Sequence, residues 1–172
     1  MSEQQQSARR ILVGVKPNQS TVVLEEAVRF ARALGASLVC AHVDVGRYVV
    51  EERPDGTVVS RPLDPDLPVL SETDFDPVLA EHVQKVVGPL AVSFRELAGE
   101  RAYALARLAE ICQVQAIVVG SRRRGMRSGL KEFFGGSVAA QLAHRQRRPV
   151  IVVPVAPVEP GAPLPWELDP TA

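Results

Sequence analysis

With 172 residues the chain has the length of one globular domain, and its hydrophobic fraction of 46% excludes a disordered chain. Its 20 basic and 20 acidic side chains cancel, which excludes a general electrostatic attraction to nucleic acid or to an anionic membrane. No stretch approaches the roughly 18 apolar residues of a membrane span, and no signal peptide is recognisable, so we expect a cytoplasmic protein without membrane contact.

The start of the chain predicts a strand, a helix and a second strand. Residues 10–16 are a short apolar run typical of a strand buried on both faces. Ser20 or Thr21 can cap the helix that follows, and Gly35 can end it. Residues 36–43 are a second apolar run, which a short crossover would place beside the first strand. The side chains expected on the buried face of the helix are Val23, Ala27, Phe30, Ala31 and Leu34.

The next segment, residues 44–75, interrupts this alternation with several prolines, and we interpret it as a surface excursion. Asp55 and Gly56 form a turn signal with apolar residues on both sides, which predicts a small hairpin. Asp76 and Pro77 then supply an N-cap and a first-turn proline, so a second helix is expected to start there.

Five further segments restore the alternation of strands and helices. Residues 91–97 alternate like a strand near a sheet edge, 101–112 have the pattern of an amphipathic helix, and 115–120 are a buried strand. After a loop, 136–144 predict a helix and 149–154 a last strand. This order predicts an α/β fold with a doubly wound, mostly parallel five-stranded sheet of the Rossmann type.

The end of the chain is rich in proline. Residues 1–157 are expected to form the α/β domain, whereas 158–172 have too few apolar residues to fold alone and are expected to form a tail that carries Trp166. Because residues 149–154 hold an apolar run at the end of the sheet, the edge that they expose predicts a homodimer.

The cysteines and histidines give no sign of catalysis or metal binding. Cys40 and Cys112 lie in apolar stretches without metal-ligand spacing, so they are expected to be buried, reduced thiols. The spacing of His42, His82 and His144 indicates no catalytic group of side chains, and we expect that the protein is not an enzyme.

The loop after the fourth predicted strand has the features of a phosphate site. Gly120 ends that strand, and in a doubly wound sheet ligands bind beyond the carboxyl ends of the strands, here in a crevice expected between Lys16 and Gly120. Gly136 and Ser137 open the next helix, whose unpaired N–H groups favour a phosphate. An alternative stays open, because glycine is common at strand ends and arginine-rich loops are often only solvated. The arginines of this loop that favour a polyphosphate are Arg122, Arg123, Arg124 and Arg127.

Residues 10–155 resemble a universal stress protein. The resemblance rests on the strands at 11–15 and 39–43, on Ala116-Ile-Val-Val-Gly-Ser121, on Gly135-Gly-Ser-Val-Ala139 and on the strand 148–154. It implies an adenine-nucleotide-binding relative of the Rossmann arrangement that is usually dimeric.

Nucleotide-binding members of this family carry the motif Gly-x2-Gly-x9-Gly-Ser/Thr, and the chain follows it in part. Gly120 matches the first glycine and Gly136-Ser137 the final pair, but the loop between them is three residues longer than in the motif. Arg123 stands where the second glycine would fall, and the nearest glycine is Gly125. The residues that the resemblance and the loop assign to the nucleotide are Val43, Gly120, Ser121, Arg122, Arg123, Gly125, Gly136, Ser137, Val138 and Lys16.

The end of the first strand departs from the family. Where the family commonly places an aspartate that contacts the nucleotide, the chain has Lys16, which cannot accept those hydrogen bonds. Its ammonium group can instead reach a phosphate, or it can simply extend into water. Val43 stands where a backbone group of the second strand would meet the base, and that contact does not depend on the side chain.

The sequence therefore predicts a regulatory protein of the stress response that binds ATP, with or without magnesium, as a homodimer through residues 149–154. The alternative is a dimeric interaction module of the same fold that binds no nucleotide. Slow ATP hydrolysis or self-phosphorylation is implied by the resemblance alone. A nucleic-acid partner is not expected, because the basic segment 122–148 lacks the stacking motif of an RNA-binding module.

Overall fold

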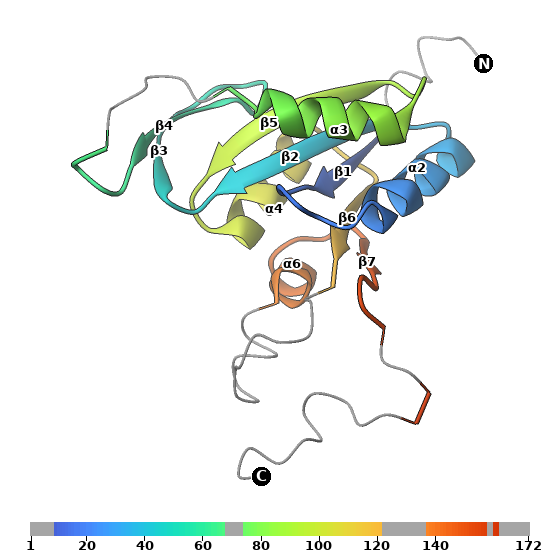
Figure 1. The fold of residues 1–172 in the computed structure, drawn as a ribbon. Coiled ribbons are helices and arrows are strands. Elements are labelled where there is room, and N and C mark those ends of the chain that lie inside the picture. The colour runs from blue at the N-terminus through green and yellow to red at the C-terminus, as the bar shows by residue number, and fades with distance from the viewer. Residues whose placement is uncertain (1–8, 68–73, 122–136, 158–159, 162–172) are drawn as a thin grey trace.

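A computed structural model describes residues 9–67, 74–121, 137–157 and 160–161. Its main sheet has five strands, all parallel, in the order β5-β2-β1-β6-β7 (Figure 1). The predicted doubly wound α/β fold is confirmed, with the third and fifth predicted strands at the two edges of the sheet. The strands are β1 (Arg10–Gly14), β2 (Ser37–Asp44), β5 (Val92–Ala98), β6 (Ala116–Gly120) and β7 (Val150–Val153).

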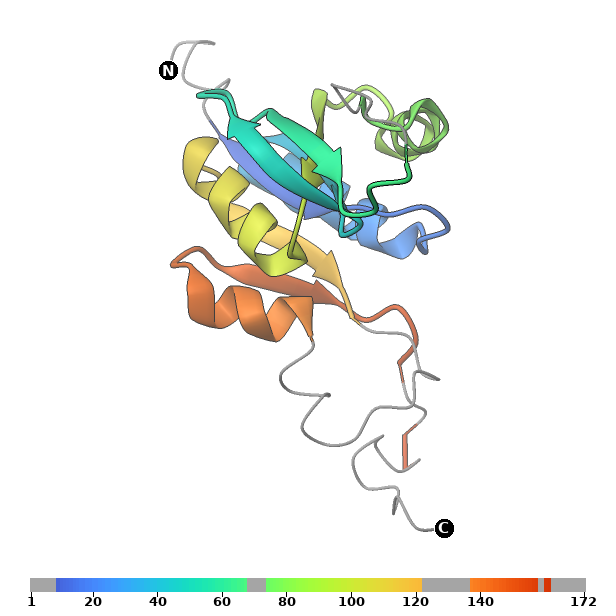
Figure 2. The ribbon, with the colours of Figure 1, turned by 90° about the vertical axis from the view of Figure 1, so that its left-hand side faces the viewer.

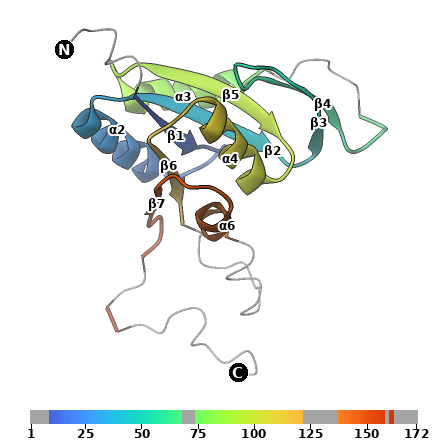
Figure 3. The same ribbon diagram turned by 180° about the vertical axis from the view of Figure 1, so that it is seen from behind.

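Helices cover both faces of the sheet. In Figure 1, α2 (Val22–Leu34) and α3 (Pro77–Val87) lie in front of the strands, and Figures 2 and 3 show α4 (Arg101–Ile111) and α6 (Val138–Arg145) on the opposite face. Successive side chains of β1 alternate between the two layers: Ile11 packs with the α2 and α3 side, and Leu12 with the α4 and α6 side. Both faces of β1 are therefore buried, as the apolar run predicts.

The buried face of α2 differs from the predicted one. Phe30 and Leu34 are 36% and 42% exposed. The buried residues are Val23, Leu24, Ala27, Val28 and Ala31.

This difference follows from helix geometry. The row that includes Val23 and Ala27 is buried together with its neighbour that starts at Leu24, whereas Phe30 and Leu34 continue the row of Glu26 on the other side. A period of 3.6 residues predicts one buried row of side chains. Which neighbouring row is also buried depends on the rotation of the helix against the sheet.

Four helix ends show different cap chemistry. Gly35 ends α2 with a left-handed φ of 59°, as predicted. Thr21 is the N-cap of α2, but its side chain makes no cap hydrogen bond. Asp76 caps α3 by accepting from the N–H groups of Val78 and Leu79, as its sequence signal predicts. At the start of α4 the carboxylate of Glu100 accepts from the N–H groups of Ala102 and Tyr103.

The predicted hairpin is present and packs against α4. Its strands, β3 (Arg47–Glu52) and β4 (Val58–Pro62), are antiparallel. Gly56 in its turn is buried with φ at 83°, and a Cβ atom there would lie 2.5 Å from Cδ1 of Leu108. Nε of Arg107 lies 3.0 Å from Oε2 of Glu52, which ties the hairpin to α4. We call Glu52, Gly56, Arg107 and Leu108 the hairpin contact.

No helix in the described part of the chain is long and apolar enough to cross a membrane. Cys40 and Cys112 are buried and unpaired, as predicted. The loop at 122–136, which carries the arginines, and the end of the tail at 162–172, which carries Trp166, lie outside the described residues.

Candidate functional site

The strand order reverses between β1 and β6. From β1 the chain winds outward through β2 to β5 on one side and through β6 to β7 on the other. Ligands of open parallel sheets bind at such a reversal, beyond the carboxyl ends of the strands. Here the paired register of β1 and β6 stops at Val13 and Val118, although both strands continue. The hydrogen-bond ladder between the two strands therefore stops before the strands end.

The main chain of Gly120 faces the point where this ladder stops. The N–H groups of Ile117 and Ser121 point to the β7 side, where they donate to Pro149 and Val153. Because neighbouring residues of a strand point their N–H groups to opposite sides, the N–H of Gly120 points toward β1. The next bond of a regular ladder would join Gly120 N–H to the Gly14 carbonyl, and it lies beyond the last pair of the register. That carbonyl instead accepts from Nε2 of Gln19 at 3.4 Å.

The main chain of Val43 faces the same space from the other side of β1. Ser37 donates to Arg9, and Ala41 accepts from Val15, so alternate residues of β2 that include Val43 turn their backbone groups toward β1. The register of β1 and β2 ends at Gly14 and Ala41. Val43 therefore directs its N–H and C=O over the end of β1, the place where the sequence predicts a contact to the base.

The loop after β1 is folded back on itself by Gln19. The N–H of Lys16 donates to Oε1 of Gln19 at 2.9 Å, while the amide nitrogen of Gln19 reaches the Gly14 carbonyl. The Lys16 residue is exposed. Sequence reasoning missed Gln19, and the only signal was an amide side chain placed shortly after a strand end.

Gly120 also has a packing role. A Cβ atom there would lie 3.0 Å from Cγ2 of Val23 and 3.1 Å from Cγ1 of Val155, closer than ordinary contact. A glycine at this strand end therefore fits two interpretations: it lets α2 and the segment after β7 approach, and it leaves room for a ligand near its backbone.

Ser121 is already engaged by the sheet edge. Its N–H donates to the Val153 carbonyl at 2.8 Å, and its Oγ accepts from the N–H of Val155 at 3.1 Å. Only its hydroxyl proton remains to be donated. The structure thus places Ser121 beside Gly120, as predicted, but gives its backbone a structural partner.

The N-terminus of α6 is built differently from those of α3 and α4. As a crossover helix, α6 runs opposite to the strands and starts at their carboxyl edge. Its N-cap is Ser137, with φ at −79° and ψ at 122°, and the Ser137 side chain makes no cap hydrogen bond. Val138 opens the first turn, and the first backbone bond runs from Gln141 N–H to the Ser137 carbonyl. Such a turn keeps N–H groups available for an anion.

We call Val43, Gly120 and Ser137 the strand-end site. A cavity of about 470 Å³ lies at the same edge of the sheet and contacts α6 at Val138. Of the predicted site residues, Arg122, Arg123, Gly125 and Gly136 lie outside the described part of the chain. The residues that line the cavity are Val45, Arg47, Tyr48, Leu63, Gly99, Glu100, Arg101, Val138 and Gln141.

The family profile of the universal stress proteins matches residues 7–154. The chain belongs to the universal stress protein family. A search of curated protein sequences found no match.

Solved structures of this family share the fold. A universal stress protein from Archaeoglobus fulgidus is 20% identical, with a TM-score of 0.57 over 84% of this chain and 98% of that chain. The universal stress protein from the same organism in complex with dAMP is 19% identical, with a TM-score of 0.52 over 84% of this chain and 97% of that chain. A universal stress protein in complex with cAMP is 20% identical, with a TM-score of 0.56 over 86% of this chain and 98% of that chain.

Proposed function

We propose that this universal stress protein binds an adenine nucleotide, ATP in the first place, at the strand-end site and acts as a regulatory protein of the stress response. The observation that carries the proposal is the end of the ladders on both sides of β1, beyond which Gly120 and Val43 direct backbone groups that have no ladder partner on β1. Backbone groups left in this way need a partner, which a ligand or water can supply.

The base and the phosphates of the nucleotide each have groups of this chain that fit them. The N–H and C=O of Val43 match the donor and acceptor edge of a base. The uncapped first turn at Ser137 and Val138 suits phosphate oxygens. Lys16 is exposed and can add a positive charge. We assign the other predicted contacts, Arg122, Arg123, Gly125 and Gly136, to the phosphates as well.

Relatives support an adenine nucleotide as the ligand class. Members of the same fold were solved with dAMP and with cAMP. No group of three or more His, Cys, Asp or Glu residues suited to a metal occurs in the described ranges, so in this proposal magnesium would arrive on the phosphates. We assign no catalytic residue and propose that occupancy by nucleotide, rather than its turnover, carries the signal.

A second candidate function is a dimeric interaction module that binds no nucleotide. The exposed Val152, on the edge strand β7, favours pairing with a second copy. Gly120 has a packing reason of its own, and Lys16 replaces the family's aspartate. We propose the homodimer through residues 149–154 in both cases, and light scattering that gives a monomer at high micromolar concentration would refute it.

We also propose that the protein works in the cytoplasm. Cys40 and Cys112 are both buried and unpaired, which suits a reducing compartment. Burial raises the pKa of the Cys40 thiol to about 12, so it stays protonated and unreactive.

The test of the nucleotide proposal has two steps. Mass spectrometry of ligand released from denatured, freshly purified protein identifies what is carried from the cell, and calorimetry with ATP, ADP, AMP, cAMP and GTP ranks affinity. We expect uptake of ATP with preference over GTP. Absence of uptake of every one at millimolar concentration would leave the interaction module as the function, and equal affinity for ATP and GTP would refute adenine specificity.

A further inference from the structure

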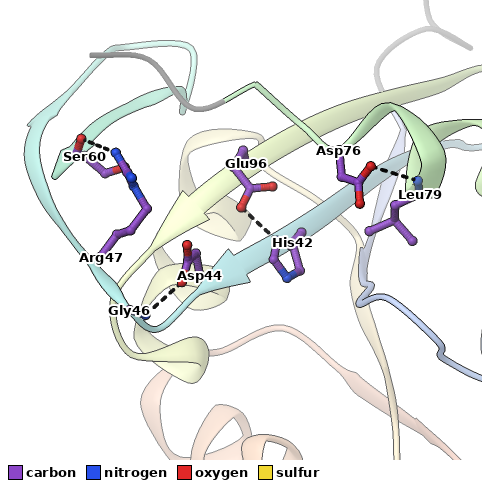
Figure 4. Close-up of polar contacts among 8 residues, drawn as sticks. All are labelled: His42, Asp44, Gly46, Arg47, Ser60, Asp76, Leu79 and Glu96. Atoms are coloured by element: carbon purple, nitrogen blue, oxygen red, sulfur yellow. Dashed lines mark hydrogen bonds and ion pairs between the residues drawn. The ribbon is translucent and has the colours of Figure 1, made fainter. Parts of the chain in front are cut away.

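His42 and Glu96 form a cross-strand pair at the carboxyl ends of β2 and β5. The two residues are in register, and Nδ1 of His42 lies 2.7 Å from Oε1 of Glu96 (Figure 4). Because Leu38 and Cys40 of β2 pack on the α2 and α3 side, the alternation of the strand places His42 on that face as well. Neither residue belongs to the strand-end site.

The Glu96 carboxylate is nearly buried, and only one of its two oxygens has a hydrogen-bond partner among the described residues. The Glu96 side chain is 9% exposed and that of His42 24%, and Oε2 of Glu96 is buried without a hydrogen-bond partner in the described part of the chain. A buried carboxylate with one unpartnered oxygen is costly unless a nearby cation compensates its charge. Protonated His42 is the cation within hydrogen-bond distance.

The residues after His42 anchor two neighbouring segments. The Asp44 carbonyl accepts from the N–H of Gly99, just before α4, at 3.0 Å, and the Asp44 carboxylate accepts from the N–H of Gly46, at the start of the hairpin, at 2.8 Å. Val43, whose backbone faces the strand-end site, lies between His42 and Asp44. Any loosening of the His42–Glu96 pair therefore acts on the backbone that positions Val43, Gly46 and Gly99.

We propose that the His42–Glu96 pair is a proton-dependent contact that fixes the carboxyl ends of β2 and β5, and with them the base of the hairpin and Val43. When His42 carries a proton, its charge compensates the buried carboxylate. When the proton leaves, the neutral ring can still donate from Nδ1, but the buried charge of Glu96 stays uncompensated. The strand ends then loosen. This inference does not require that the strand-end site binds nucleotide.

The charges around His42 favour its protonated form. The hydrogen bond to Glu96 raises the pKa of His42 above its ordinary value near 6.5, and the charges of Glu96 and Asp44 act in the same direction. Partial burial and the positive charge of Arg101 on α4 oppose the increase in pKa. From α3, Asp76 faces the same end of the sheet, but its carboxylate accepts from the helix N–H groups.

The hairpin contributes Arg47, whose guanidinium is bonded to Ser60 at 2.9 Å and 2.8 Å. The sign of the pH effect then follows. A histidine whose folded pKa is raised stabilises the fold fully below its unfolded pKa, near 6.5, and the stabilisation is lost as pH rises through the folded pKa. The contact is therefore closed in mildly acidic solution and weakens toward alkaline pH.

NMR titration of the three histidines of the full chain gives the first measurement. We expect His42 to titrate above the ordinary histidine pKa near 6.5. In Glu96→Gln the pKa of His42 should fall relative to the wild type, because the compensating carboxylate is gone and burial remains. Titration of His42 at or below the ordinary histidine pKa near 6.5 in the wild-type protein would overturn the proposal.

Amide hydrogen exchange of the Gly46 and Gly99 N–H groups gives the second measurement, after correction for the intrinsic pH dependence of exchange. The protection factors should fall as pH rises through the pKa of His42, by about tenfold for each unit by which folding raises that pKa. In His42→Gln they should be independent of pH, whereas the control His82→Gln should behave like the wild type. Equal pH dependence in wild type and His42→Gln would refute the coupling even if His42 titrates as expected, and wild-type exchange together with the Glu96→Gln titration decides the case if His42→Gln does not fold.

Discussion

The hairpin contact and the strand-end site are both built around a glycine, but the surroundings of the two glycines differ. At the hairpin contact, Gly56 is buried with a left-handed φ, the ion pair of Arg107 and Glu52 closes the contact, and a Cβ atom would overlap Leu108. At the strand-end site, a Cβ atom added to Gly120 would lie 3.0 Å from Cγ2 of Val23, so the steric overlap would be smaller than at Gly56.

What distinguishes the two regions is the state of the neighbouring polar groups. Beside the hairpin contact, the first turn of α4 is capped by Glu100. At the strand-end site, the ladder bonds of Gly120 and Val43 to β1 are not formed, and Ser137 leaves the first turn of α6 without a side-chain cap. A glycine in a sequence thus does not tell packing from binding, whereas the partners of the surrounding backbone groups do. Substitutions in the two regions should separate stability from affinity.

The largest effect is expected at the hairpin contact. Gly56→Ala forces a side chain into a left-handed conformation and places its Cβ atom 2.5 Å from the buried Leu108. Backbone strain and overpacking together should lower the free energy of unfolding by about 2–4 kcal/mol. Denaturant unfolding measures the loss. Gly35→Ala is the matched control, because Gly35 also has a left-handed backbone, with φ at 59° and ψ at 42°, but nothing within 4 Å of the added atom, and it should lose only about 1 kcal/mol. Equal losses in the two variants would mean that Leu108 moves aside freely.

The opposite pattern is expected at the strand-end site. If Ser137 donates to a phosphate, Ser137→Ala should lower ATP affinity about tenfold to a hundredfold, since a hydrogen bond to a charged group contributes about 1.5–3 kcal/mol. Stability should change by less than about 0.5 kcal/mol, because the Ser137 side chain caps nothing. Thr21→Ala, at a second N-cap without a side-chain bond, is the control and should leave affinity unchanged. Loss of stability without loss of affinity in Ser137→Ala would reverse the comparison.

The α4 cap should respond in stability alone. Glu100→Ala removes the acceptor of two first-turn N–H groups and should lower the free energy of unfolding by about 1 kcal/mol, which is about 2–4 °C in Tm for a chain of this size. ATP affinity should not fall, because the lost carboxylate repels an anion. Calorimetric Tm and ATP titration of the same preparation check both statements, and a weaker affinity for ATP would show that the α4 N-terminus takes part in binding.

Much of the fold could be predicted because its signals are local. The apolar runs of the strands, the Asp76-Pro77 start of α3 and the Gly35 end of α2 depend on a few neighbouring residues each. The Asp55-Gly56 turn is of the same kind, and the hairpin formed around it.

What could not be predicted depends on contacts between distant residues. Phe30 and Leu34 match the helical period, but the rotation of α2 against the sheet left them outside. The docking of Gly56 on Leu108 joins segments far apart in the sequence. The role of Glu100 was not predicted, because glutamate is not among the preferred N-cap residues.

For the site, sequence reasoning placed Gly120, Val43 and Ser137 at one edge of the sheet, because parallel strands and crossover helices leave little choice. It did not predict that Gln19 would bind the end of β1 or that Ser121 would be bonded to the segment after β7. Both depend on side chains that reach across a loop, where propensity carries no information.

The smallest effect is expected for Lys16, one of the positions at which the sequence differs from the pattern expected of the family. Lys16 is exposed, and its backbone N–H, not its side chain, holds the loop through Gln19, so Lys16→Ala should leave the fold intact. An exposed charge contributes about 0.2–1 kcal/mol, which predicts an ATP affinity lower by no more than about fivefold. Because salt screens exposed charges, the difference between wild type and Lys16→Ala should shrink as ionic strength rises. The loss should also be larger for ATP than for AMP, since a point charge responds to phosphate charge and not to the base. Calorimetry with both nucleotides at low and high salt measures this, and a loss that is equal for ATP and AMP and insensitive to salt would place Lys16 at the nucleoside instead of the phosphates.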